Sequence, residues 1–426
     1  MVARRLSLFY RLNVRSAVDS SADRSARILE HLRTAGGFHF PDYRGGSLVN
    51  LLSSIIRAFG GTSPHPGLRA LDEAVFKGIS RIVYLVLDGV GYKQLDRFMA
   101  AGGGEHFFAR HPGLGLRITT VFPSTTAAAV TTLSTGAAPA EHGVLSWHLH
   151  LHDLGLVGAV LPGRTLTGTR LAGKDFNLRR YLGLPSYLSS VRRHKRLLSF
   201  GALGRSAYSN AGTRWNGYGA FQTLAGMERQ TVSFAREGGR GVAYVYWPLY
   251  DSLCHREGVE ARKTRLHLAE IDKSLGRLAR GLAGTETLLL VTADHGVVDA
   301  PPPKRIELTA VPGLLDCLAL LPAGDARQVS CFVRPAREAR FREVVARHLA
   351  EACVCITGEE LLESGLLGPG DPHPSLRNRV GDYVLLARDD YAFRVTPPLT
   401  KARIHKGNHG GLSSDEIYVP LYALRL

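Results

Sequence analysis

Three stretches of the chain are continuous apolar and β-branched runs, and each carries an aspartate at or just beyond its end. The runs span residues 81–89, 241–247 and 287–296, and the aspartates are Asp88, Asp251 and Asp294. Runs without polar alternation are typical of strands buried on both faces, as in parallel sheets covered by helices. Apolar residues recur at spacings of 3, 4, 3 and 4 from Leu268 to Leu282, which predicts an amphipathic helix between two of these strands. The chain therefore contains a βαβ unit, and we expect an α/β fold with a mostly parallel central sheet sandwiched between helices.

The aspartates that follow these strands indicate a binding site. Open α/β sheets bind ligands beyond the carboxyl ends of their strands. A single aspartate at such a position is ordinarily a helix cap or a turn residue. Here there are three, and two of them have histidine partners, His255 in DSLCH and His295 in ADHG. A third histidine, His409, stands in GNHGG near the C-terminus.

Carboxylates and imidazoles in this number suit a pair of divalent cations. Zinc takes imidazole nitrogen and carboxylate oxygen as ligands, and two such ions about 3.5–4 Å apart clamp the entering and leaving oxygens of a displacement at phosphorus. Asp251 and His255 are four residues apart and share one face of a helical turn. The sequence thus predicts a two-metal site for phosphoryl transfer, and Zn²⁺ is the expected ion.

A nucleophile for such a reaction is expected in the segment FPSTTAAAVTTLSTG, which begins at Phe122. Pro123 and Ser124 mark the start of a helix of small residues. A hydroxyl at a helix N-terminus gains from the positive end of the dipole and from the free N–H groups, which also hold phosphate oxygens. Taken alone, such a serine or threonine is an ordinary helix cap.

The order of these motifs resembles the alkaline phosphatase superfamily, and within it the type I phosphodiesterase/nucleotide pyrophosphatase branch. The resemblance covers about residues 78–147, 240–300 and 400–426. It implies two zinc ions and a covalent phospho-enzyme intermediate. It also implies that one metal is held by Asp251, His255 and His409, and the other by Asp88, Asp294, His295 and the nucleophile Thr126.

Two positions depart from the pattern of that branch. Its nucleophile is a threonine directly before Phe-Pro, where this chain has Val121. In the superfamily the nucleophile lies ten residues before the glycine that ends the helix, which designates Thr126, with Thr125 and then Ser124 as the alternatives. An asparagine that binds a phosphoryl oxygen in the branch corresponds to Trp147 here. This contact must come from elsewhere, for example from a backbone N–H, so the substrate subclass stays open.

The rest of the chain is expected to divide around this core. Residues 1–77 form an N-terminal extension that packs on the core, and residues 78–300 form the catalytic core with an insertion at 148–240. Residues 301–400 show short strand-like runs around a helical stretch, which predicts a small inserted α+β cap. Residues 401–426 return to the core.

Charge and composition leave the partner open. The net charge is +16 and arginine dominates the basic residues, which suits either an anionic substrate or a solvated surface. The cluster at 192–196 could contact nucleic acid or lie on a solvated helix face or loop. The five cysteines show no CxxC spacing, no apolar run is long enough to span a bilayer, and the apolar stretch before Arg11 is too short for a signal peptide. We therefore expect a cytoplasmic protein.

These observations predict a metal-dependent hydrolase of phosphate esters that cleaves phosphodiester or nucleotide pyrophosphate bonds through a phospho-threonine. The expected partner is an anionic phosphate-ester small molecule such as a nucleotide. The alternative is a phosphomonoesterase or a phosphonate hydrolase on the same scaffold. An inactive, basic nucleic-acid-binding protein is disfavoured because all six expected side-chain ligands other than Thr126 are intact. The aromatic residues Phe122, Trp147, Trp247 and Tyr250, and the histidines His405, His148, His150 and His152, remain candidates for the surroundings of the site.

Overall fold

A seven-stranded central sheet forms one half of the molecule. The computed structural model describes residues 21–111, 115–171, 177–397, 400 and 404–426. The strand order is β2 (Gly115–Thr119), β18 (Tyr418–Arg425), β9 (Thr287–Thr292), β1 (Arg81–Leu87), β8 (Gly241–Trp247), β6 (His194–Phe200) and β7 (Gly217–Phe221). The strand β18 runs antiparallel to both of its neighbours, and the remaining pairs are parallel. The predicted mostly parallel sheet is confirmed.

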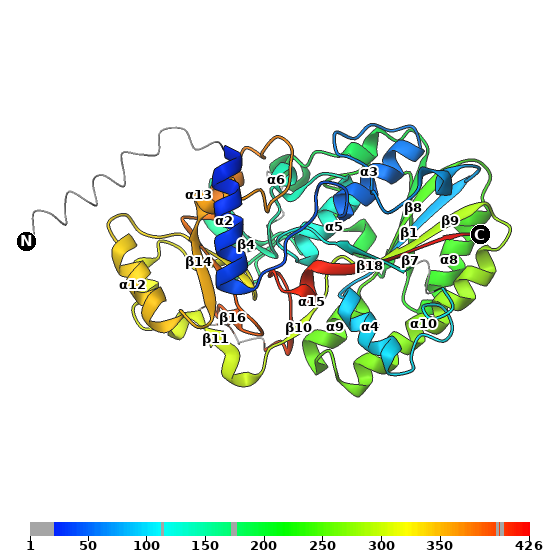
Figure 1. Ribbon diagram of the computed structural model, residues 1–426. Coiled ribbons are helices and arrows are strands. Elements are labelled where there is room, and N and C mark those ends of the chain that lie inside the picture. Colours follow the sequence, from blue (N-terminus) through cyan, green and yellow to red (C-terminus); the bar gives the residue numbers. More distant parts are fainter. Residues whose placement is uncertain (1–20, 112–114, 172–176, 398–399, 401–403) are drawn as a thin grey trace, which may run out of the picture.

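Helices cover both faces of this sheet (Figure 1). On one face α3 (Leu48–Ala58) packs against α5 (Thr126–Thr135), and on the other α8 (Leu224–Arg236) packs against α10 (Arg262–Leu282). Every residue of β1, β8 and β9 is buried, because both faces of these strands meet helices. The apolar stripe of α10 contributes Leu268, Ile271, Leu275, Leu278 and Leu282 to the same core.

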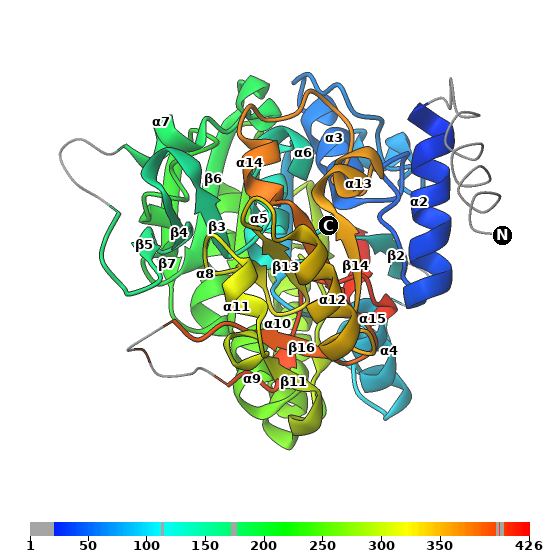
Figure 2. The same cartoon turned by 90° about the vertical axis from the view of Figure 1, so that its left-hand side faces the viewer.

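A second seven-stranded sheet forms the cap, which faces the viewer in Figure 2. Its order is β14 (Cys353–Thr357), β15 (Tyr383–Ala387), β13 (Gln328–Cys331), β12 (Ala323–Asp325), β3 (His148–Leu151), β4 (Leu156–Ala159) and β5 (Arg164–Thr165). All of its pairs are antiparallel. The helix α12 (Glu338–His348) buries Phe341 and Val344 against this sheet. The predicted α+β cap thus exists, and it draws on more of the chain than residues 301–400.

Residues 148–240 do not form one insertion. The strands β3, β4 and β5 extend the cap sheet, whereas β6 and β7 belong to the central sheet. The sequence signal fails at β6 because it begins inside the basic cluster at 192–196. In that cluster Lys195 is buried and its ammonium donates to the carbonyl of Val191, and Arg196 pairs with Glu237. This part of the cluster begins β6, with His194 and Arg196 partly buried, whereas Arg192 and Arg193 are exposed.

The N-terminal extension divides between the two halves. The helix α2 (Ser21–Gly36) packs on β14 and α13 (Gly358–Glu363) of the cap, and α3 packs on the core. Residues 1–20 lie outside the described part of the chain. All five cysteines are free. Within the described residues, no helix combines the length and the apolar character needed to cross a membrane.

Candidate active site

The carboxyl ends of three adjacent strands bring the predicted aspartates together. Asp88 follows β1, and Asp294 lies two residues beyond the end of β9. Asp251 lies in α9 (Leu249–Glu257), which begins just after β8. His409 follows the short strand β17 (Gly407–Asn408), which pairs with β10 (Val298–Asp299). Because β8 and β9 flank β1, their ends meet at one edge of the sheet.

Asp88, Asp294, His295 and Thr126 form the first group of ligand atoms. The Nε2 atom of His295 lies 3.6 Å from Oδ1 of Asp88 and 3.5 Å from Oδ2 of Asp294. The same nitrogen lies 3.0 Å from Oγ1 of Thr126. The side chains of Asp294 and His295 are fully buried.

Asp251, His255 and His409 form the second group. Oδ2 of Asp251 lies 2.9 Å from Nε2 of His255, and Oδ1 of the same carboxylate lies 3.9 Å from Nε2 of His409. The His295 and His409 rings stack with 3.8 Å between their centroids, which joins the two groups. The side-chain donors of Asp251, His295 and His409 lie within 4.8 Å of one another, as do those of Asp88, Asp294 and His295. All seven predicted ligands therefore meet at one place.

Neighbouring groups orient these ligands. Nδ1 of His255 faces the carbonyl of Gly407 at 2.8 Å, and Nδ1 of His295 faces that of Gly296 at 3.1 Å. A carbonyl can only accept, so each Nδ1 donates its proton there, and Nε2 is the ring atom that faces the site. Oδ2 of Asp88 accepts a hydrogen bond from the Tyr246 hydroxyl.

The backbone fixes Asp294 in a similar way. Its Oδ1 atom accepts from the backbone N–H groups of Gly89, at 3.1 Å, and His295, at 3.0 Å. The other oxygen, Oδ2, is left to face the site.

Burial acts to raise the pKa values of the three carboxyl groups, because it disfavours their charged form. It raises the pKa of Asp88 well above its usual range, and the carboxylates of Asp294 and Asp251 add to the rise. Burial also raises the pKa of Asp294, against the effect of His295. At Asp251 burial acts in the same direction, but His255 and His409 outweigh it and lower the pKa. The pKa of His255 is raised to about 9, because Asp251 outweighs burial and Asp325 adds to its effect.

The donor set fits divalent cations. Oδ1 of Asp88, Oδ1 of Asp251, Oδ2 of Asp294 and Nδ1 of His409 are buried without a hydrogen-bond partner among the described residues. Burying a carboxylate without a partner costs several kcal/mol of free energy, and a cation bound to these oxygens would offset this cost. Three carboxylates with two divalent ions carry a net charge of about +1, which suits an anionic substrate.

The three candidate hydroxyl groups have different partners. The Ser124 hydroxyl donates to the carbonyl of Gly411 at 2.7 Å, and the Thr125 hydroxyl donates to Asp325 at 2.5 Å. The Thr126 hydroxyl contacts His295. Thr126 is the first residue of α5 and Thr125 is its N-cap, so the hydroxyl of Thr126 lies where the free N–H groups of the helix begin.

A cap residue that sequence reasoning missed lies beside these groups. Asp325 is the last residue of β12, and its Oδ2 atom also accepts from the backbone N–H of Trp147 at 3.0 Å. The backbone N–H at the position of the expected asparagine is thus bound to a carboxylate. No periodic signal in the sequence PAGDARQ singles out this aspartate, so it could not have been found without the fold.

The site opens into a cavity of about 1560 Å³ between the core and the cap. Asp88, Thr126, Asp251, His255 and His409 line it together with residues of both sheets. Its apolar lining includes Val130, Leu184, Leu197 and Trp215. The cavity is much larger than a phosphate group, so it has room for substituents on the phosphorus.

The side chains proposed from the sequence as surroundings of the site divide in two. Trp147, His148 and His405 line the cavity, and the His405 ring lies 4.2 Å from that of His255. Phe122, Trp247, Tyr250 and His150 are buried, and His152 is exposed; none of these five lines the cavity. Tyr246, which binds Asp88, was not identified from the sequence, although it lies one residue before Trp247 in the strand β8.

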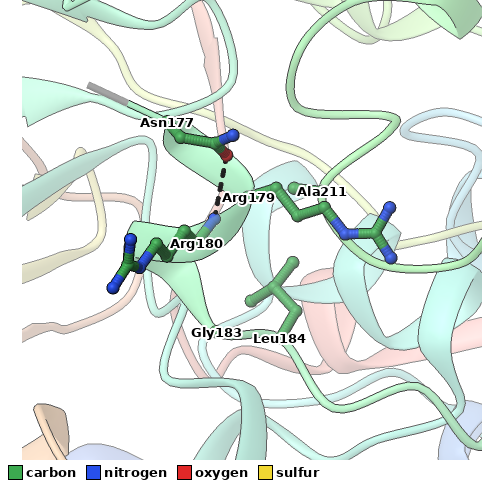
Figure 3. A pocket seen from close by; sticks show the side chains of 6 residues that line it. All are labelled: Asn177, Arg179, Arg180, Gly183, Leu184 and Ala211. Carbon is green, nitrogen blue, oxygen red and sulfur yellow. Dashed lines mark hydrogen bonds between the residues drawn. The ribbon is translucent and has the colours of Figure 1, made fainter. Parts of the chain in front are cut away.

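A second and shallower pocket of about 340 Å³ shares Leu184 with the lining of this cavity (Figure 3). Asn177, Arg179, Arg180, Gly183, Leu184 and Ala211 line it. Asn177 caps the short helix α7 (Leu178–Leu182) by accepting from the backbone N–H of Arg180 at 3.1 Å. None of its lining residues is a candidate ligand or nucleophile.

Comparisons with known proteins agree with this geometry. The family model described as type I phosphodiesterase/nucleotide pyrophosphatase matches residues 82–154 and 204–412. Murine ectonucleotide pyrophosphatase/phosphodiesterase 5 has a similar structure, with a TM-score of 0.60 and 15% identity over 80% of this chain and 87% of that one. An inactive threonine-to-alanine variant of the murine protein in complex with AMP gives a TM-score of 0.59 at 15% identity and the same coverage.

A bacterial structure is also similar. Phosphonoacetate hydrolase from Sinorhizobium meliloti 1021, in complex with phosphonoformate, has a TM-score of 0.59 and 17% identity over 80% of this chain and 89% of that one. No curated protein sequence matches the chain. At these identities the structural likeness establishes the fold.

Proposed function

Because this chain belongs to the type I phosphodiesterase/nucleotide pyrophosphatase family, we propose that it cleaves phosphodiester or nucleotide pyrophosphate bonds through a covalent phospho-threonine at Thr126. The chain is a hydrolase that acts on phosphoester bonds. The proposal adds the nucleophile, the two divalent cations, which we take to be Zn²⁺, and the preference for diesters. The substrate is an anionic phosphate-ester small molecule.

The observation that carries the proposal is the position of the Thr126 hydroxyl. It lies 3.0 Å from Nε2 of His295, an atom that also faces Asp88 and Asp294. The Thr126 hydroxyl therefore lies among the candidate ligands, whereas the hydroxyl of Ser124 donates to Gly411 and that of Thr125 to Asp325. In the murine protein, the variant in which a threonine is replaced by alanine is inactive, which is consistent with a threonine as the nucleophile.

The residues of the chain support a displacement at phosphorus. Asp88, Asp294, His295 and Thr126 would hold one ion, and Asp251, His255 and His409 the other. When bound, the ions would favour the alkoxide form of Thr126 and balance the charge on the phosphoryl oxygens. The first N–H groups of α5 face the same region and favour an anion there.

The reaction then has two displacements. The Oγ1–P bond to Thr126 forms as the bond to the leaving oxygen breaks on the opposite side of phosphorus, and the hydroxyl proton of Thr126 is lost to solvent. The oxygen of a water molecule next bonds to phosphorus as the Oγ1–P bond breaks, and one proton of that water passes to Oγ1, which restores the Thr126 hydroxyl and releases the phosphate product. The volume of the cavity supports a diester, because two substituents on phosphorus need space on two sides.

The similarity to phosphonoacetate hydrolase keeps phosphonate hydrolysis as the second candidate function. The fold is shared with that enzyme at 17% identity, and the candidate ligand groups suit an ester and a phosphonate alike.

A substrate panel on the purified protein tests the proposal. We expect bis(p-nitrophenyl) phosphate to be cleaved faster than p-nitrophenyl phosphate or phosphonoacetate. T126A should lower kcat at least about 10³-fold, and mass spectrometry of acid-quenched enzyme should detect phosphate on the peptide that carries Thr126. S124A and T125A are the matched controls and should retain most of the activity. Full activity of T126A, or cleavage of the monoester alone, would show that the proposal is wrong.

A further inference from the structure

We propose that Asp325, supplied by the cap, is a specificity-determining residue that disfavours dianionic phosphate monoesters relative to monoanionic diesters. This inference rests on the proposed function and names the charge of its substrate. Asp325 contacts three parts of the site: the start of α5, the backbone of Trp147 and the loop that carries His409.

The first contact is with the helix that carries the nucleophile. Oδ2 of Asp325 accepts from the hydroxyl of Thr125, the N-cap of α5, at 2.5 Å. The carboxylate therefore lies next to the residue that precedes Thr126. It lines the same cavity as Thr126 and His409.

The second contact is with Trp147. The backbone N–H of Trp147 donates to the same Oδ2 atom at 3.0 Å. A free N–H at this point could have donated to a phosphoryl oxygen. Because Asp325 accepts it, a hydrogen-bond donor for the substrate is exchanged for a negative charge.

The third contact is with the loop that carries His409. Gly410 has φ +114, and a Cβ atom on it would lie 3.1 Å from Cβ of Asp325. The close approach of the two backbones holds Asp325 beside the residue that follows a metal ligand.

Asp325 forms no ion pair within the described ranges, although its charge contributes to the raised pKa of His255. Its two hydrogen-bond donors, a hydroxyl and a backbone N–H, are neutral. A second negative charge on a substrate at Thr126 is repelled by this carboxylate, because both residues line the same cavity. Since a monoester carries about one more negative charge than a diester at neutral pH, the carboxylate selects against monoesters.

The variant D325N tests this inference with little change of shape. An asparagine oxygen can still accept from Thr125 and from Trp147, so the variant removes the charge and retains the hydrogen bonds. We expect kcat/KM for p-nitrophenyl phosphate to rise about tenfold relative to that for bis(p-nitrophenyl) phosphate. D316N is the matched control, because Asp316 is an exposed aspartate on α11 (Leu314–Cys317) of the cap that does not line the cavity. Its substrate ratio should not change.

A binding measurement separates charge selection from an effect on turnover. In the T126A background, D325N should tighten the calorimetric Kd of inorganic phosphate about tenfold. If D325N leaves both the substrate ratio and this Kd unchanged, or alters both substrates equally, Asp325 only supports the fold and the inference is overturned. That result would leave the proposed function intact, whereas a wild-type protein without diesterase activity would refute the proposed function itself.

Discussion

The two seven-stranded sheets contribute to the cavity in different ways. The half built on the central sheet carries all seven candidate ligands, including Thr126 and His409, at the carboxyl edge of its strands or in adjoining segments. The cap sheet is antiparallel throughout, carries none of the candidate ligands, and contributes Asp325 to a cavity lined by residues of both halves. We therefore propose that the core determines which reaction occurs, whereas Asp325 of the cap contributes to the choice of substrate. The predictions below test this division of roles.

Removal of divalent metal should have the largest effect. The ligands of the core lie within 4.8 Å of one another and include buried, unpaired carboxylate oxygens, so the protein without metal should lose at least about 10³-fold in diesterase activity. It should also unfold at a lower temperature, because an ion that binds only the native state stabilises it. Chelation followed by readdition of Zn²⁺, with activity and thermal unfolding as readouts, checks this. Full activity at less than about 0.1 metal per chain would contradict a metal-based core.

The junction between the halves should be the next most sensitive feature. The buried guanidinium of Arg327, in the cap, pairs at 3.0 Å with the buried carboxylate of Glu416, which follows the His409 loop. R327M should lower the free energy of unfolding by about 3 kcal/mol, because it leaves a buried charge without its partner. Urea unfolding measures this.

A matched control for the junction lies on the surface of the cap. Arg340 and Glu343 form an ion pair in which both side chains are about half exposed, and R340M should cost less than about 0.5 kcal/mol. Equal effects of R327M and R340M would show that the buried pair does not join the halves.

A third prediction concerns the support of the ligands within the core. The Tyr246 hydroxyl donates to Asp88, so Y246F should weaken metal binding about 10–100-fold. The neighbouring Tyr244 is the control, since its buried hydroxyl has no hydrogen-bond partner in the part of the chain that is described. Y244F should be neutral or slightly stabilising. Competition with a metal indicator gives both affinities, and similar values for the two variants would contradict a role for the Tyr246 hydroxyl.

The smallest effect is expected from a carboxylate of the cap that lies outside the ligand groups. Burial raises the pKa of Glu307, but hydrogen bonds from Thr396, Thr309 and Arg394 outweigh it and lower the pKa to about 2. A lowered folded-state pKa stabilises the protein above the unfolded value near 4.5, and this stability is lost as the pH falls toward 2. E307Q should therefore cost about 1 kcal/mol at pH 7, and less as the pH approaches 3. Urea unfolding at several pH values checks this, and a pH-independent cost would refute it.

The strands and site residues of the core could be predicted from the sequence, because the patterns that indicate them lie within short segments of the chain. A strand buried on both faces must be apolar along its length, as β1 is, and Asp88, Asp251 and Asp294 stand out where such runs stop. The strand β6 was missed because Lys195 buries an apolar stem and binds a carbonyl inside the protein. The extent of the cap was also missed, because β3 and β12 pair across more than 170 residues.

By itself the sequence determined the chemistry of the site: which carboxylates, imidazoles and hydroxyls are present, and that parallel strands deliver three of them to one edge. Only the tertiary structure decided which of three adjacent hydroxyls contacts His295, and what stands beside Trp147. Asp325 is 200 residues from Thr125 in sequence. Periodicity records whether a residue is buried but not which distant residue it meets. That is decided when the antiparallel cap sheet closes over the core.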